Sequence, residues 1–323
     1  MQHNLSLDFV MSFCRDKIPG HGEDSYCYSF CDIAGLLGAF DGCGGAGARK
    51  HDYYSGHTEA YMASRFCAGV FYEQFRRLFP CNQTADNLTE GFFAPQMTQR
   101  LIDFKPPKNE TGFQIKGASV RTLPSTAAVV LIRQVENGSV SVSAIWAGDS
   151  RVYIMNSLGL AQLTVDDSTV TDPMINIYED GIHTNVLCTE KPVKLHCKTV
   201  MMNEPFVVFS ATDGCFSYLS TPMEFEGVLL ETLLKTKCVA DWESELANSI
   251  GVVAGDDHTL CLAAYGYGSY PALQKSFTRR YEYIEKHYLL PVSNMPVEDR
   301  ESRFELWGSY CDNYMRYIKD EQT

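Results

Sequence analysis

The N-terminal part of the chain shows an alternation of apolar and polar positions that is typical of strands. Leu5, Leu7, Phe9 and Met11 occupy every second position, which is the period of a strand with one buried face. The stretch from Tyr26 to Phe40 is rich in residues that favour strands, and glycines follow it. We therefore predict paired strands within the first forty residues.

The pattern then becomes helical. From about His57 to Phe79, apolar side chains recur at three- and four-residue spacing, which is typical of a helix with one buried face. The residues of this stripe are Met62, Phe66, Val70, Phe71, Phe75 and Leu78. We interpret the stripe as core packing. Residues 80–117 are rich in proline and polar residues and are predicted to be irregular, apart from a short helix at Gln96–Phe104.

A strand-rich block follows in the middle of the chain. Apolar residues in 127–135 and 140–146 flank Asn137-Gly138, and Asn-Gly supplies the positive φ angles of a type I′ hairpin turn. Two further strands are predicted at 151–155 and 160–165, with a turn between them. These elements form a meander.

The last part of this region mixes a buried strand at Phe206–Ser210, helices at Pro222–Leu234 and Trp242–Ile250, and a strand at Thr259–Tyr265. Strands and helices thus come in blocks, without the strict alternation of a doubly wound parallel sheet. The pattern favours an antiparallel sandwich with helices packed outside.

The chain after Tyr265 has a different pattern. We predict a linker at Gly266–Pro271 and then two helices separated by a proline turn at Pro291–Pro296. The second helix carries an apolar stripe of Phe304, Trp307, Cys311, Tyr314 and Ile318. That stripe needs a surface, either the protein's own preceding domain or, through residues 300–318, a second copy or partner. We therefore divide the chain into a main domain at 1–265 and a helical extension at 266–323.

Composition limits the function classes. The chain has 323 residues, with 45% hydrophobic and 21% charged residues, as in ordinary globular proteins. Its net charge of −13 argues against a nucleic-acid surface and against docking on an anionic membrane. The N-terminus lacks the pattern of a signal peptide, and the 12 cysteines contain no C-x-x-C pair. We expect a soluble, cytoplasmic protein with reduced thiols.

Four short acidic motifs stand where predicted strands meet turns. They are Glu23-Asp24, Asp41-Gly42, Asp213-Gly214 and Gly255-Asp256-Asp257-His258. One such pair is usually a solvated turn, but carboxylates that end separate strands can converge and hold hard divalent cations. Mg²⁺ and Mn²⁺ prefer oxygen ligands and keep several waters. Two such ions roughly 3.5–4 Å apart can activate a shared water, and phosphate hydrolysis is the natural use of that arrangement.

In order and spacing, these motifs resemble those of the metal-dependent protein phosphatases (PPM, type 2C). The segments that carry the resemblance are Glu23-Asp24-Ser25, Asp41-Gly42-x-Gly44-Gly45, Ser125-Thr126-Ala127, Ala147-Gly148-Asp149-Ser150-Arg151, Leu163-Thr164-x-Asp166-x-Ser168, Ala211-Thr212-Asp213-Gly214 and Asp256-Asp257-His258-Thr259. Single Asp-Gly pairs are weak signals, whereas the ordered set is specific. The resemblance covers about residues 5–265 and suggests a bacterial-like or divergent member.

The resemblance implies an αββα sandwich, with a metal site at one end that uses two Mn²⁺ or Mg²⁺ ions and in some members a third. Asp41 would bridge the two ions and Gly42 would offer its carbonyl, while Asp213 and Asp256 complete the site. Glu23 and Asp24 would act through water, and Asp149 would join Asp213 on a third ion. A turn with a local Asp149–Arg151 salt bridge is the alternative for that motif. The implied reaction is in-line attack on phosphorus by a hydroxide that bridges the ions, on a serine/threonine phosphoprotein.

The chain also departs from the family pattern. Cys43 and Pro19 stand where a histidine and a phosphate-gripping arginine are expected. Lys17, His21 and Arg49 are the candidate phosphate contacts, although solvated loop charge is an alternative for Arg49. These departures keep open a pseudophosphatase that only binds, and a hydrolase of small phosphate compounds. A cysteine phosphatase using Cys43 or Cys215 is disfavoured because neither has the C-x5-R loop.

Overall fold

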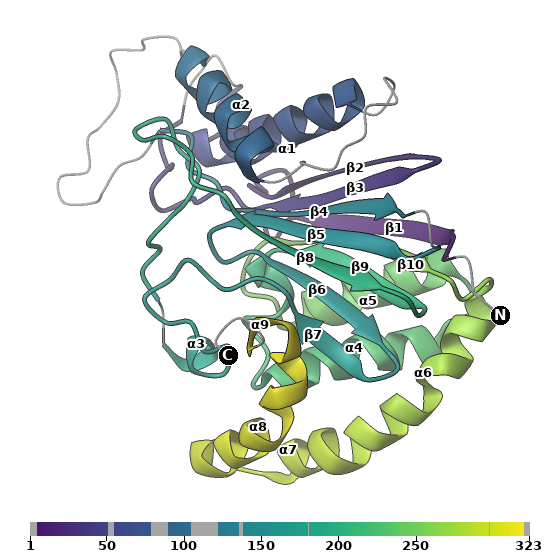
Figure 1. Ribbon diagram of the computed structural model, residues 1–323. Coiled ribbons are helices and arrows are strands. Elements are labelled where there is room, and N and C mark those ends of the chain that lie inside the picture. The colour runs from purple at the N-terminus through teal and green to yellow at the C-terminus, as the bar shows by residue number, and fades with distance from the viewer. Residues whose placement is uncertain are drawn as a thin grey trace.

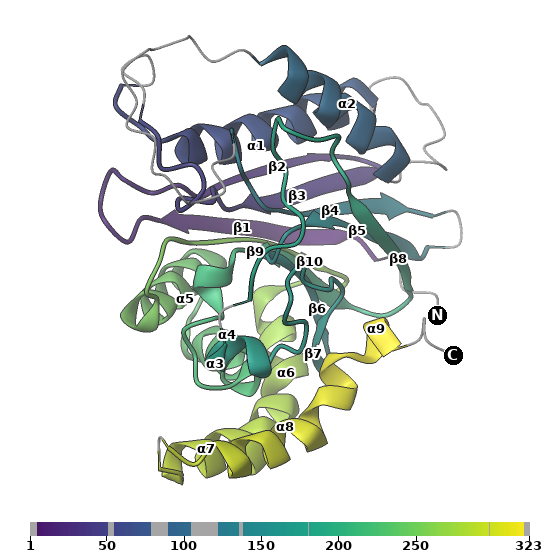
Figure 2. The same cartoon turned by 90° about the vertical axis from the view of Figure 1, so that its left-hand side faces the viewer.

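The computed structural model describes residues 5–50, 55–78, 90–104, 122–135, 138–179, 181–296 and 298–319. Two five-stranded sheets lie face to face, with helices on both outer sides (Figure 1). The layers are clearest from the side, where α1 and α2 cover one sheet and α4, α5 and α6 cover the other (Figure 2). The predicted αββα sandwich is confirmed.

The first sheet contains the predicted central hairpin. Its strand order is β2 (Ser25–Cys31), β3 (Ala34–Phe40), β4 (Ala127–Gln134), β5 (Val140–Ala147) and β8 (His196–Met202). All neighbouring pairs are antiparallel. The β4–β5 pairing confirms the hairpin, although Asn137 of its predicted turn lies outside the described residues.

The second sheet joins the two ends of the region 1–265. Its order is β1 (Leu7–Arg15), β10 (His258–Tyr265), β9 (Phe206–Ala211), β6 (Arg151–Asn156) and β7 (Gly159–Gln162). The N-terminal strand therefore pairs antiparallel with a strand about 250 residues later. This long-range pairing brings the first and last acidic motifs to the same sheet.

The interior of the sandwich is a continuous apolar layer between the sheets. Val130, Val142, Ile154, Val208 and Ala263 are fully buried there. Because helices cover the outer faces as well, all residues of β3, β5, β6 and β9 are buried. Burial on both faces explains why β3 and β9 appear in the sequence as nearly continuous apolar runs.

The outer face of the first sheet is covered by α1 (Glu59–Leu78) and α2 (Glu90–Asp103). The stripe of α1 packs into this core as predicted, with Phe71 and Phe75 fully buried. The α2 helix is longer than predicted and runs through Pro95. Burial of Phe93 and Met97 against α1 outweighs the backbone hydrogen bond that a proline removes.

The outer face of the second sheet is covered by α4 (Pro222–Lys235) and α5 (Val239–Val253), close to their predicted positions. The first turn of α4 is stabilised by Glu224, whose carboxylate accepts a hydrogen bond of 3.0 Å from the Thr221 backbone N–H, and by a proline at its start. Trp242 of α5 is fully buried and donates its indole N–H to Thr232 of α4 at 3.1 Å.

The extension differs from its prediction. After α6 (Tyr270–Ile284) the helical path continues through a π-helical turn at Glu285–Leu289 and α7 (Leu290–Asn294), and α8 (Arg300–Tyr314) and α9 (Arg316–Lys319) follow. Pro291 was expected to break the helix. It lies instead in the first turn of α7, where its missing N–H costs little.

The linker is also shorter than predicted, because α6 begins at Tyr270, with Ser269 as its N-cap and Pro271 in its first turn. None of the helices in the described ranges is long and apolar enough to span a bilayer.

Candidate active site

The acidic site consists of Glu23, Asp24, Asp41, Asp149, Asp213 and Asp256. Strand register places all six at one end of the sandwich. In the first sheet, the start of β2 pairs with the end of β3, and Ala127 of β4 pairs with Ala147 at the end of β5. In the second sheet, Ala211 at the end of β9 pairs with both Leu260 and Arg151. The residues that immediately precede or follow these strand ends are the acidic motifs.

The electrostatics of Asp41 show that the motifs from both sheets meet. Burial raises the pKa of Asp41 well above its usual range, and four neighbouring charges raise it further. Those charges belong to Asp24, Asp213, Asp149 and Asp256. Burial likewise raises the pKa of Asp213 to about 7, with Asp149 and Asp256 adding to the rise. The structure therefore brings together the residues that the sequence singled out.

The backbone of Asp41 is held on both sides. Its carbonyl accepts hydrogen bonds from the Thr126 N–H at 2.8 Å and the Ser125 hydroxyl at 2.9 Å. Its N–H donates to the Thr126 hydroxyl at 3.2 Å. These bonds come from the residues at the start of β4, so the sheet itself fixes the position of Asp41.

Asp24 is the most deeply buried acid of the site, with 2% exposure. Burial raises the pKa of Asp24 to about 8, while the hydrogen bond from the Thr212 hydroxyl, at 2.7 Å, opposes that rise. The same hydroxyl accepts from the Thr259 N–H at 2.9 Å. Thr212 thereby links Asp24 to the strand ends of β9 and β10.

Glu23 is oriented by the start of α1, because the Thr58 hydroxyl donates to one of its carboxylate oxygens. Asp257 fixes the loop that leads to it, accepting from the backbone N–H groups of Glu23 at 2.6 Å and Lys17 at 2.7 Å. The sequence pattern did not indicate that Asp257 fixes this loop. Its position beside Asp256 was the only available signal.

Two glycines of the motifs are required by close approach. A Cβ on Gly42 would lie 2.2 Å from the Ala60 carbonyl oxygen, and one on Gly214 would lie 1.9 Å from that of Asp257. Real Cβ contacts are never so short, so any other residue would push apart the segments that carry the acidic residues. Close packing therefore requires glycine at both positions.

The alternative of a local Asp149–Arg151 salt bridge is wrong. Arg151 makes a two-pronged ion pair with Asp166, at 2.9 Å from Nε and 2.7 Å from Nη2, and both side chains are buried. Burial raises the pKa of Asp149 to about 7, the nearby Asp166 charge adds to the rise, and the Arg151 charge opposes it. Asp149 is therefore left to face the acidic site.

His183 is a neighbour of the site that sequence reasoning missed. Its Nε2 lies 3.7 Å from Oδ2 of Asp149, and its charge counteracts the rise of the Asp213 pKa. It lies in the polar segment 166–188, where a single histidine carries no sequence pattern that would point to Asp149. Only the path of the segment between β7 and β8 brings the two together.

The donor set fits divalent cations. Within the described part of the chain, no three His, Cys, Asp or Glu side chains are gathered as closely as the ligands of a formed metal site. Mg²⁺ and Mn²⁺ keep several waters, however, so their protein ligands need not touch one another. Oδ1 of Asp149 is buried without a hydrogen-bond partner, and the repulsion around Asp41 would be relieved by positive charge. Oxygen donors of this kind suit Mn²⁺ or Mg²⁺.

The three candidate phosphate contacts have different surroundings. The Lys17 ammonium donates to the Ala254 carbonyl, and Arg49 lies 3.4 Å from the buried carboxylate of Glu59. His21 lines a cavity of about 360 Å³ together with Glu23. Of the three, the structure brings only His21 into a cavity shared with an acidic-site residue.

That cavity also holds the positive charge of Lys50, the neighbour of Arg49 in the chain. Besides His21 and Glu23, its lining comprises Ile18, Lys50, Gly56, His57, Thr58 and Tyr61. Arg65 stacks over the Tyr61 ring at 3.4 Å and bonds the Gly22 carbonyl at 3.4 Å.

Cys215 does not suit nucleophilic chemistry. It is 1% exposed, and burial raises the pKa of its thiol well above the usual value. Its Sγ donates to the Thr259 carbonyl at 3.3 Å. Since the thiolate is the nucleophile, the cysteine-phosphatase alternative loses support for this residue.

By sequence, the chain matches no protein-family model and no curated protein. By structure, it is similar to the serine/threonine phosphatase Stp1 from Staphylococcus aureus, with a TM-score of 0.57, 20% identity, and coverage of 82% of this chain and 97% of that one.

Two further solved structures agree. PppA, a key regulatory component of T6SS in Pseudomonas aeruginosa, has a TM-score of 0.56, 17% identity, and coverage of 81% and 99%. The catalytic domain of the serine/threonine protein phosphatase PstP, solved in complex with two manganese ions, has a TM-score of 0.52, 14% identity, and coverage of 80% and 97%. The chain therefore shares the fold of bacterial PPM-type serine/threonine phosphatases.

Proposed function

We propose that this protein is a metal-dependent phosphomonoester hydrolase, and specifically a serine/threonine phosphoprotein phosphatase. The observation that carries the proposal is the meeting of acidic residues from both sheets at one end of a sandwich with this fold. Clustered, buried carboxylates are unfavourable unless cations neutralise them. Phosphate hydrolysis is a reaction that uses such cations.

The roles follow from the positions of the side chains. Asp41, Gly42, Asp213 and Asp256 would hold two Mn²⁺ or Mg²⁺ ions, with Glu23 and Asp24 acting through water and Asp149 available to a third ion. When bound, these ions activate a water and neutralise the phosphoryl oxygens. The chain's own part is positional: Thr126 holds Asp41, Thr212 holds Asp24 and Thr58 holds Glu23.

The accessibility of the site supports a macromolecular substrate. Asp256 is exposed, and the cavity beside Glu23 is lined by Lys50, His21 and His57. A phosphorylated side chain on a protein surface could reach such an edge. The basic lining stands out on a chain with a net charge of −13 and would attract the phosphate dianion.

The test is hydrolysis of an aryl phosphate and a phosphothreonine peptide with and without Mn²⁺, in the native chain and in Asp41→Ala and Asp256→Ala. We expect manganese-dependent turnover that both variants lose. Asp32→Ala is the matched control, because Asp32 is exposed in the turn at the other end of β2 and β3. Turnover that persists in Asp41→Ala would refute the proposed site.

A binding protein without catalysis is the second candidate. The observation that favours it is that Lys17 and Arg49 are engaged by Ala254 and Glu59 instead of facing the site. It predicts no turnover but measurable affinity for a phosphopeptide by calorimetry. Turnover of the aryl phosphate without turnover of the peptide would indicate a small-molecule phosphatase on the same fold.

A further inference from the structure

The polar segment 166–188, described apart from residue 180, is bonded directly to the turn that carries Asp149. Asp167 exchanges two hydrogen bonds with Gly148: its N–H donates to the Gly148 carbonyl at 2.9 Å, and its Oδ2 accepts from the Gly148 N–H at 3.1 Å. The Thr184 N–H donates to the Asp167 carbonyl at 2.8 Å. This double attachment places His183 beside Asp149, with 3.7 Å between Nε2 and Oδ2.

The opposite side of the same segment is held by the C-terminal extension. The indole N–H of Trp307, on α8, donates to Oδ2 of Asp172 at 3.3 Å. Oδ1 of Asp172 accepts from the Met174 and Ile175 N–H groups, at 2.8 and 3.1 Å, where α3 (Ile175–Tyr178) begins. One carboxylate thus joins α8 to the local fold of the segment.

Tyr178, at the end of α3, adds a second contact with α8. Its ring centroid lies 5.9 Å from that of Phe304, and the Arg300 guanidinium lies 4.7 Å above the ring. Both partners lie on α8. The α8 helix therefore contacts the segment at two points, Asp172 and Tyr178, which are six residues apart in sequence.

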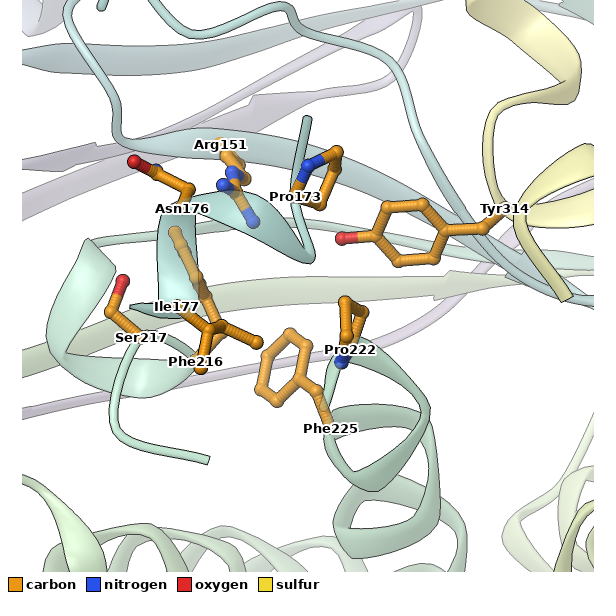
Figure 3. A pocket seen from close by; sticks show the side chains of 9 residues that line it. All are labelled: Arg151, Pro173, Asn176, Ile177, Phe216, Ser217, Pro222, Phe225 and Tyr314. Carbon is orange, nitrogen blue, oxygen red and sulfur yellow. The ribbon is translucent and has the colours of Figure 1, made fainter. Parts of the chain in front are cut away.

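A third connection leads from α8 to Arg151, two residues beyond Asp149. The Tyr314 hydroxyl lies 3.1 Å from that of Tyr153, and Nη1 of Arg151 donates to Tyr153 at 3.4 Å. Figure 3 shows Tyr314, Arg151 and Asn176 around one small cavity, with room for about one water. Asn176 in turn donates to Asp166, the ion-pair partner of Arg151, at 3.1 Å.

The α8 helix is itself firmly anchored. Glu226 of α4 is fully buried and accepts from Nε and Nη2 of Arg280, at 2.7 and 2.8 Å, and from the Tyr310 hydroxyl. Trp307, Tyr310 and Tyr314 are all at least 95% buried in the core shared with α4 and β6. The face of α8 that contacts the 166–188 segment is therefore part of the hydrophobic core.

We propose that α8 is a positioning element of the acidic site. Trp307 is its main positioning residue, because it fixes the 166–188 segment through Asp172 and so holds His183 beside Asp149. This inference rests on the proposed function for its catalytic consequence. The expected consequence is tighter retention of a cation that Asp149 and Asp213 would hold. Weakening the contact between α8 and the segment should therefore raise the metal concentration required and leave the substrate KM largely unchanged.

The test compares Trp307→Phe with Trp242→Phe. Trp242 is the matched control, since it is equally buried and also loses one indole hydrogen bond, to Thr232, but lies on α5. Amide hydrogen exchange by mass spectrometry is read over peptides that cover residues 168–179. We expect about tenfold faster exchange there in Trp307→Phe, the factor for losing a hydrogen bond to a carboxylate, and no change in the control.

Asp172→Asn provides the same test from the other partner. In the variant, the amide oxygen takes the position of Oδ1 and still accepts from the Met174 and Ile175 N–H groups. The NH₂ group then takes the position of Oδ2 and cannot accept from the Trp307 indole. We expect accelerated exchange in this variant as well, even if Trp307→Phe fails to fold. Unchanged exchange over 168–179 in Asp172→Asn would overturn the inference.

The activity readout separates this inference from the proposed function. We expect the Mn²⁺ concentration for half-maximal turnover to rise by about tenfold in Trp307→Phe, with Trp242→Phe unchanged. Faster exchange with an unchanged Mn²⁺ requirement would refute the link to the acidic site. Absence of turnover in the native chain would refute the proposed function alone, because the exchange experiment does not depend on activity.

Discussion

Removing Arg280 provides the most direct test of how the extension docks. Arg280→Met leaves the Glu226 carboxylate fully buried, with the Tyr310 hydroxyl as its remaining donor among the three contacts described above. Breaking a buried ion pair from one side costs about 3–5 kcal/mol, because the surviving charge keeps its desolvation penalty. That is a large part of the roughly 5–15 kcal/mol by which a typical protein is stable.

The magnitude translates into a measurable melting shift. An unfolding entropy of about 2.1 cal/mol/K per residue corresponds to about 0.7 kcal/mol/K for a chain of 323 residues. The expected loss is therefore about 4–7 °C in Tm by calorimetry. Arg279→Met is the matched control, since Arg279 is the exposed neighbour on the same helix, and it should stay within about 0.5 kcal/mol of the native chain.

A second substitution isolates the ion pair. In Arg280→Met combined with Glu226→Leu, no charge is left buried, so most of the lost stability should return. If Arg280→Met melts within about 1 °C of the Arg279→Met control, then Glu226 is not enclosed between α4 and the extension in solution. In that case docking of the extension on the protein's own domain would be contradicted, and a partner for residues 300–318 would be favoured.

Three further predictions concern the acidic site. Burial raises the pKa of Asp24 to about 8 and of Asp213 to about 7. Between about pH 4 and pH 8 the folded metal-free chain therefore keeps protons that the unfolded chain has lost. These two groups consequently lower the free energy of unfolding as pH rises through that range. Saturating Mg²⁺ should then raise Tm more at pH 8 than at pH 5, and equal shifts would contradict this account. Gly42→Ala should abolish manganese-dependent turnover, since its Cβ would lie 2.2 Å from the Ala60 carbonyl oxygen; near-native turnover would show that α1 can shift. Cys43→Ser combined with Cys215→Ser should leave turnover largely intact, and complete loss in a folded double variant would revive a thiol mechanism.

Much of the architecture could be predicted because its signals are local. The alternation in β1, the stripe of α1 and the hairpin of β4 and β5 each depend on residues close together in sequence. The misjudged elements are those in which packing overrides propensity. The α2 helix passes through Pro95 because Phe93 and Met97 are buried. Pro291 is accommodated in the first turn of α7, which directly follows a π-helical turn.

The acidic site also has some features that could be predicted from the sequence and others that could not. Each Asp-Gly motif could be recognised from its neighbours, since glycine permits the tight approach that Gly42 and Gly214 make. The partner of Arg151 could not be recognised in this way, because Asp166 is 15 residues away and lies beyond the end of β7. His183 also had no pattern to identify it, and only the path of the 166–188 segment brings it to Asp149.

The amino-acid sequence alone therefore determined the strand ends, the acidic residues placed on them and the chemistry those oxygens favour, because turns and periodicity are encoded within a few residues. The tertiary structure decided which acidic side chains lie close together and which arginine side chains pair with buried carboxylates. Antiparallel register across two sheets brings Asp41 and Asp213 together. Because these side chains are buried, Arg151 pairs with Asp166 and Arg280 pairs with Glu226. Such choices depend on contacts between residues distant in sequence, where the cost of burying an unpaired charge selects the partner.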